Sequence, residues 1–129
     1  MQEKGLIINR EVEINRGQET DIKVECFSNE NKTTLWKVII EAKGCWHKDI
    51  DTAMETQLVN RYLKDYESQN GIYLIGWFLC DKWDKSDYRY NDTKKITKAE
   101  AQGQYDQQAI GLSSGGYDIR AVVLDTGLK

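Results

Sequence analysis

The chain has 129 residues, with 18 basic and 21 acidic side chains and a formal net charge of −3. This length accommodates one domain with a hydrophobic core and is short for two. The acidic balance excludes a protein that coats nucleic acid through net positive charge, so any contact with nucleic acid must be local. The sequence has no apolar run of membrane-spanning length and no apolar signal-peptide core. We therefore expect a cytoplasmic protein that has no membrane partner.

Three segments predict strands in the first third of the chain. Residues 6–16 start apolar and then alternate, residues 21–27 alternate cleanly, and residues 34–43 are rich in β-branched and aromatic side chains. The polar stretches "GQE" and "SNENKT" between them are typical of turns. We expect the segment 34–43, which ends at Gly44, to be central in the sheet.

A change of period predicts a helix over residues 49–67, with Asp49 or Asp51 as its N-cap. The apolar run "NGIYLIGWFLC" follows, and it predicts a strand over residues 72–79 that is buried on both faces and parallel to its neighbour.

The last third of the chain predicts a long polar loop, "DKWDKSDYRYNDTKK", and then a helix over residues 97–112 that ends at "SSGG". A final strand is expected over residues 117–125. The resulting order is β-β-β-α-β with an extra C-terminal α-β unit, which predicts a single α/β domain over residues 1–129 with a mixed sheet flanked by helices.

Two charged residues interrupt the apolar third strand. Glu41 and Lys43 are two residues apart and therefore share one face of the strand. Asp21 begins the preceding antiparallel strand, and ordinary hairpin pairing brings it to the same end of the sheet. Two carboxylates bind a hard divalent cation, and a nearby ammonium can act on a water molecule and on a phosphate. This arrangement suits hydrolysis of a phosphodiester.

The spacing of these three residues is similar to a motif of a known nuclease family. Asp21, followed after about twenty residues by Glu41-Ala42-Lys43 at the end of an apolar strand, resembles the PD-(D/E)XK nuclease superfamily. The resemblance implies a restriction-endonuclease-like fold and a nuclease that hydrolyses phosphodiester bonds, in DNA above all. It also implies that Asp21 and Glu41 bind Mg²⁺, for which Mn²⁺ can substitute, and that Lys43 acts on the attacking water. Nucleic acid is then the partner.

Some branches of the superfamily also carry a Gln and a Tyr on the helix after the third strand. Gln57 and Tyr62 match them here, with Arg61 one turn beyond Gln57, and the resemblance assigns Gln57 to the catalytic cleft. Thr20 stands where the motif has proline.

The family core begins with a helix, and the sequence predicts none before Leu6. We expect the chain to be the C-terminal fragment of a larger protein, the effector end of a bacterial polypeptide. Alternatively, Glu11 or Glu13 supplies the missing acidic group. As protein partners we expect either a second copy of the chain, in a homodimer, or upstream domains of the same larger polypeptide.

Two other functions fit parts of the sequence. A catalytically lapsed nuclease-like fold could serve as a nucleic-acid-binding or dimerisation module. A sugar hydrolase would use Asp21 and Glu41 as its two carboxylates, but it would leave Lys43 without a role.

Several remaining features have simple structural interpretations. His47 is expected to be an exposed loop residue and "GLSSGG" a helix stop. Trp77 and Trp83 are expected to pack in the core or at an edge, and the cysteines, which form no C-x-x-C pair, are expected to be free thiols.

Overall fold

The computed structural model describes residues 4–15, 18–28, 34–64 and 68–127, and within these ranges it describes side chains from Lys37 onward. The elements follow one another in the predicted order, and one short helix is added within the predicted loop. They are β1 (Lys4–Asn15), β2 (Gln18–Ser28), β3 (Thr34–Gly44), the π-helix η1 (Met54–Leu63), β4 (Asn70–Trp77), α1 (Tyr88–Asp92), α2 (Lys98–Ser113) and β5 (Asp118–Asp125).

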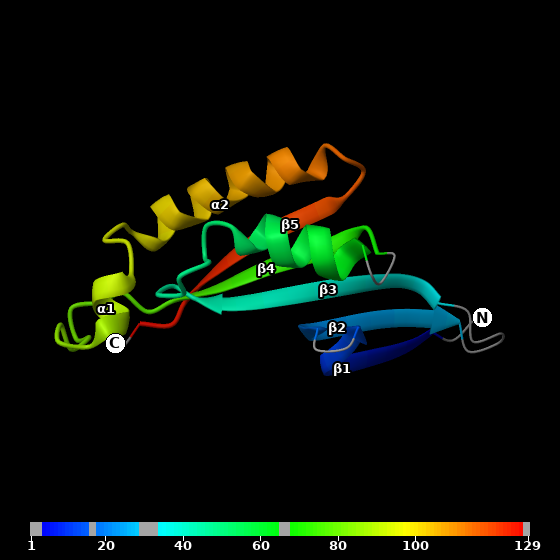
Figure 1. Ribbon diagram of the computed structural model, residues 1–129, viewed down its shortest axis with the longest axis horizontal. Helices are drawn as coiled ribbons and strands as arrows, with labels where there is room; N and C mark the ends of the chain where they lie inside the picture. Colours follow the sequence, from blue (N-terminus) through cyan, green and yellow to red (C-terminus); the bar gives the residue numbers. More distant parts are fainter. Residues whose placement is uncertain (1–3, 16–17, 29–33, 65–67, 128–129) are drawn as a thin grey trace.

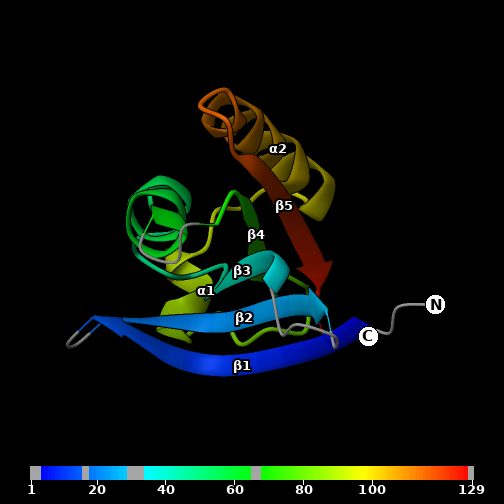
Figure 2. The same ribbon diagram turned by 90° about the vertical axis from the view of Figure 1, so that its right-hand side faces the viewer.

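The five strands form one mixed sheet in the order β1-β2-β3-β4-β5. The pairs β1–β2 and β2–β3 are antiparallel, whereas β3–β4 and β4–β5 are parallel. Figure 2 shows β1 at one edge of the sheet and β5, with α2 beside it, at the other. The prediction of an α/β fold with a mixed sheet and a parallel fourth strand is therefore confirmed, and β3 is central as expected.

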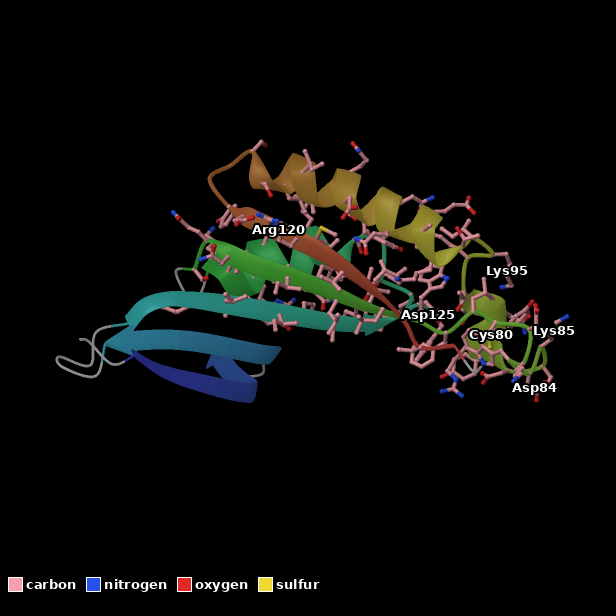
Figure 3. The ribbon with its side chains drawn as sticks, turned by 180° about the vertical axis from the view of Figure 1, so that it is seen from behind. Cys80, Asp84, Lys85, Lys95, Arg120 and Asp125 are labelled. Carbon is pink, nitrogen blue, oxygen red and sulfur yellow. The ribbon has the colours of Figure 1, made fainter. Side chains whose placement is uncertain are left out.

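Among the side chains that the structure describes, the core lies between one face of the parallel strands and the two long helices. The register aligns the buried residues of neighbouring strands: Glu41 pairs with Tyr73, and Tyr73 pairs with Ala121. Helix η1 lies in front of β4 in Figure 1, and the strands lie in front of η1 when the molecule is seen from behind in Figure 3. The helices bury apolar residues against this face, namely Met54, Leu58 and Leu63 of η1 and Ala101, Tyr105 and Ala109 of α2.

Strand β4 is not buried on both faces, and this prediction was wrong. Its residues alternate between buried and half-buried along the whole strand. Both connections run the same way across the sheet, from β3 to β4 and from β4 to β5. Parallel crossovers of one handedness that advance in one direction put their helices on the same face. The opposite face therefore leaves Ile72 and Leu74 half-buried, and it exposes Val122 and Leu124 of β5.

The helix after β3 is shorter than predicted. Residues 49–52 form turns, and the N-cap of η1 is Ala53 instead of Asp49 or Asp51. Residues 65–67 lie outside the described part of the chain. Asp51 instead links the turn before η1 to the segment 94–105. Its Oδ1 accepts a hydrogen bond of 3.0 Å from the hydroxyl of Tyr105 and forms an ion pair with Lys94.

The second half contains one helix that was not predicted. Helix α1 falls within the predicted loop, and the Asp87 carboxylate caps it by accepting from the backbone N–H of Arg89. Helix α2 is close to its predicted bounds and begins with a capping box of Thr97 and Glu100. The predicted helix stop is confirmed at Ser113, and Gly116 then takes a φ of 92°. Among the described residues, no helix is long and apolar enough to cross a membrane.

Candidate active site

Glu41 and Lys43 lie near the carboxyl end of β3 on the face that the helices cover. The Nζ of Lys43 is 3.0 Å from Oε1 of Glu41. Glu41 is only 2% exposed, although it carries a carboxylate. Removing such a charge from water is expensive unless a cation and hydrogen bonds compensate it. The ammonium of Lys43 supplies that positive charge, and its side chain is itself mostly buried.

Tyr73 of β4 is the sheet neighbour of Glu41. Its hydroxyl donates a hydrogen bond of 2.8 Å to the backbone carbonyl of Ile50. Burial raises the pKa of Tyr73 far above its usual value, and the negative charge of Glu41 raises it further. Tyr73 is therefore a neutral hydrogen-bond donor beside the carboxylate.

The backbone register shows where Asp21 stands on β2. Ile22 pairs with Ile40, and Lys23 pairs with Ile39. One residue further along each strand are Asp21 and Glu41, so the same register sets these two positions opposite each other. Directly opposite residues of an antiparallel pair share a face of the sheet. The side chain of Asp21 lies outside the described residues, as do those of Glu11 and Glu13.

The residues expected on the helix have different surroundings. Gln57 is half-buried on η1, next to the buried Leu58. Tyr62 is part of the hydrophobic core, and the guanidinium of Arg61 lies 6.0 Å from the centre of its ring. Gln57 thus keeps a partly accessible amide, while Tyr62 serves the core.

His47 is half-buried, which differs from the expected exposed loop residue. Its Nδ1 accepts a hydrogen bond of 3.0 Å from the backbone N–H of Asp49. Burial lowers the pKa of His47 below 6.5, and the nearby charge of Lys43 lowers it further. The imidazole is therefore neutral at pH 7.

The donor set of this region suits a hard cation only if Asp21 takes part. Within the described residues, no group of three or more His, Cys, Asp or Glu side chains could hold a metal ion. The predicted ligand pair, Asp21 and Glu41, has one member outside that range. Two opposite carboxylates have Cβ atoms about 5 Å apart, which is close enough for both to bind one ion.

A separate pocket lies at the carboxyl ends of the parallel strands, and the sequence did not predict it. It has a volume of about 300 Å³, and we call it the aromatic pocket. The sequence carries a signal for it, because "GCW" and "GWF" both set an aromatic residue two positions after a glycine at the end of a strand. The lining residues are Trp46, Phe78, Cys80, Trp83, Arg89 and Thr126. Trp77, in contrast, is buried in the core as expected.

Comparison of the chain with protein-family models, with curated proteins and with solved structures finds no match. The motif and the order of the strands are therefore what relates this chain to a known family, and that relationship stays a prediction.

Proposed function

We propose that the chain is a metal-dependent nuclease of the PD-(D/E)XK type that hydrolyses phosphodiester bonds in DNA. The observation that carries the proposal is the buried carboxylate of Glu41, paired with Lys43 at 3.0 Å, one register position beyond the Ile22–Ile40 pair. Two carboxylates opposite each other repel, which favours a bound cation between Asp21 and Glu41. A buried carboxylate with an adjacent lysine is a candidate for a chemical site.

The topology also supports this proposal. Three antiparallel strands, a helix and a strand parallel to the third form the β-β-β-α-β order that the resemblance implies. The restriction-endonuclease-like fold is thus part of the proposal, with α2 and β5 as an addition to its core.

Asp21 and Glu41 would hold Mg²⁺, or Mn²⁺ in its place. A bound Mg²⁺ supplies a Lewis acid that lowers the pKa of water and offsets charge on the phosphate. Lys43 would hold the attacking water and stabilise the negative charge that develops on the phosphoryl oxygens. The amide of Gln57 would orient the water or the phosphate by hydrogen bonding. We assign no step to His47, because its Nδ1 already accepts a hydrogen bond from the backbone N–H of Asp49.

One observation favours a second function. The ion pair between Lys43 and Glu41 already neutralises both charges within the chain. A lapsed nuclease that only binds nucleic acid or dimerises would keep such a pair for stability.

Cleavage of plasmid DNA separates the two functions. We expect cleavage with Mg²⁺ and none in excess EDTA. Asp21→Asn, Glu41→Gln and Lys43→Ala should each lower the cleavage rate by orders of magnitude. The matched controls are Glu55→Gln and Lys64→Ala, which remove an exposed charge of the same kind and should leave the rate unchanged.

Metal binding can be measured independently of cleavage. Mg²⁺ should raise the melting temperature of the wild type and of Lys43→Ala, but not that of Glu41→Gln. DNA binding without cleavage at any metal concentration would favour the lapsed module. If only a longer polypeptide with further upstream residues cleaves DNA, the same residues carry the activity and the chain is one part of the enzyme.

A further inference from the structure

The aromatic pocket is built where three parallel strands end. Trp46 follows β3, Phe78 follows β4 and Thr126 follows β5, while Cys80, Trp83 and Arg89 come from the segment between β4 and α2. Figure 3 shows Cys80 beside Asp125, the last residue of β5. Open α/β sheets commonly bind ligands outside the carboxyl ends of their strands.

Two glycines make room for the walls of the pocket. Gly44 and Gly76 are paired neighbours at the ends of β3 and β4. A Cβ atom on Gly44 would lie 2.5 Å from the ring of Trp46, and one on Gly76 would lie 2.9 Å from the ring of Phe78. Both rings therefore fold back over the strand ends, into space that any other residue would fill.

Three rings meet around the pocket without stacking on one another. The ring centre of Trp46 is 5.2 Å from that of Phe78 and 6.4 Å from that of Trp83, with interplanar angles of 55° and 74°. Phe78 and Trp83 are 6.3 Å apart and are also tilted. Tilted rings at these distances line a concave apolar space of about 300 Å³, within the range of small-ligand sites.

One charged group is held at the rim. The guanidinium of Arg89 lies 5.3 Å from the ring centre of Trp46. Asp87 holds it through hydrogen bonds from Nε at 3.1 Å and Nη2 at 2.8 Å, and Asp87 also accepts from Nε1 of Trp83 at 3.3 Å. Arg89 lowers the pKa of Asp87 far below its usual value, so this clamp stays charged.

This chemistry selects a flat, unsaturated ring with hydrogen-bond acceptors at its edge. Aromatic walls favour stacking, and a guanidinium donates to carbonyl oxygens and ring nitrogens. A cationic ligand is disfavoured because Arg89 already occupies one face of Trp46. A pocket of this volume is large enough for one base, and a base that is stacked and paired within a duplex is inaccessible to it.

We propose that the aromatic pocket binds one unpaired base of the nucleic acid, so that the preferred substrate is single-stranded or locally unpaired. This inference rests on the proposed nuclease function for the class of ligand. Trp46 lies three residues after Lys43 on the same segment, and the exposed Lys48 follows it two residues later. A strand whose base enters the pocket therefore passes close to positive charge that can contact its phosphates.

The test measures binding by the full chain in EDTA, where no metal-dependent cleavage occurs. Quenching of tryptophan fluorescence is followed with a short DNA single strand and with a fully paired hairpin of the same composition. We expect the single strand to bind at least about tenfold more tightly, since stacking of one base contributes a factor of this size. Equal affinity for the two forms would overturn the proposal.

Two variants localise the binding to the pocket. Trp83→Leu removes one wall, and Thr126→Phe fills the mouth from an exposed position without removing any ring. Each should weaken single-strand binding about tenfold. Tyr88→Leu is the control, because Tyr88 lies on α1, is 67% exposed and does not line the pocket. Melting temperatures identify any variant that fails to fold, and the second variant then decides.

Cleavage of DNA with Mg²⁺ distinguishes the two proposals. If the wild type cleaves DNA but both pocket variants bind single strands normally, the pocket proposal fails and the nuclease proposal stands. If the wild type binds single strands through the pocket but cleaves no DNA with any metal, the pocket proposal stands and the nuclease proposal fails.

Discussion

Lys43 lies 3.0 Å from the carboxylate of Glu41, and both side chains are buried on the helix-covered face of β3. Lys43→Met keeps much of the side-chain volume but removes the cation from a buried carboxylate. We expect the free energy of unfolding to fall by about 3 kcal/mol, as when one partner of a buried ion pair is removed. Urea denaturation measures this loss.

Glu41→Gln combined with Lys43→Met should recover part of that loss, because no charge is then left without its partner. Lys48→Met is the control and should change stability by less than about 0.5 kcal/mol, since Lys48 is exposed. Equal stability of wild type and Lys43→Met would show that the pair contributes nothing to folding.

The proposed catalytic role of Gln57 can be tested against a control residue, Asn60, on the same helix η1. If Gln57 has the role that we propose, Gln57→Ala should lower the rate of DNA cleavage about tenfold or more, because a positioned hydrogen-bond donor is lost. Asn60→Ala removes an exposed amide of η1 and should leave the rate unchanged. Similar rates for the two variants would exclude Gln57 from the catalytic cleft.

Two glycines, Gly44 of β3 and Gly103 of α2, predict opposite effects of substitution by alanine. Gly44→Ala drives a methyl group into the ring of Trp46 and should reduce stability by about 1–3 kcal/mol. Gly103→Ala should increase stability by about 0.5–1 kcal/mol, because Gly103 lies within α2 and a Cβ there meets nothing within 4 Å. Thermal or urea unfolding measures both. A stabilising Gly44→Ala would mean that Trp46 does not pack over the glycine.

Two buried tyrosines predict a loss of stability at high pH. Burial raises the pKa of Tyr73 and of Tyr105 well above the ordinary value of 10, and the nearby Glu41 and Asp51 add to the effect. Above pH 10 the unfolded chain releases these protons while the folded chain keeps them. The stability is therefore complete below pH 10 and falls above it, by about 1.4 kcal/mol per pH unit for each tyrosine.

The slope of stability against pH identifies these groups. Tyr73→Phe and Tyr105→Phe should each make the slope above pH 10 shallower by about 1.4 kcal/mol per pH unit, because each variant lacks one ionisable hydroxyl. This change in slope is independent of any change in stability at pH 7. Tyr88→Phe alters an exposed side chain and should leave the slope as it is. An unchanged slope in both core variants would contradict the assignment.

Regular periodicity made most of the fold predictable. The alternation of apolar and polar residues over 21–27 predicts the start of β2 to within three residues. It does so because successive side chains of a strand point to opposite faces of the sheet. Helix α1 is too short to show a period, and it depends on the cap that Asp87 provides. The open face of β4 was missed because an apolar run does not reveal on which face the neighbouring helices lie.

The two candidate sites differ in how far the sequence reveals them. Glu41 and Lys43 belong to one strand, so the period-two rule alone brings them together. The aromatic pocket depends on which strands are neighbours. Thr126 reaches Phe78 only because β5 pairs with β4, and the backbone N–H of Thr126 extends that pairing with a hydrogen bond of 3.0 Å to Trp77. No local pattern encodes that adjacency.

Strand β3 joins an antiparallel hairpin on one side to a parallel, helix-covered half on the other. Among the described side chains, the hydrophobic core belongs to the parallel half, whereas Asp21 belongs to the hairpin. A slip of one residue between β2 and β3 would turn Asp21 to the face opposite Glu41 and would leave the pairing of β3, β4 and β5 unchanged. Catalytic competence would then follow the alignment of the hairpin and not the folding of the core.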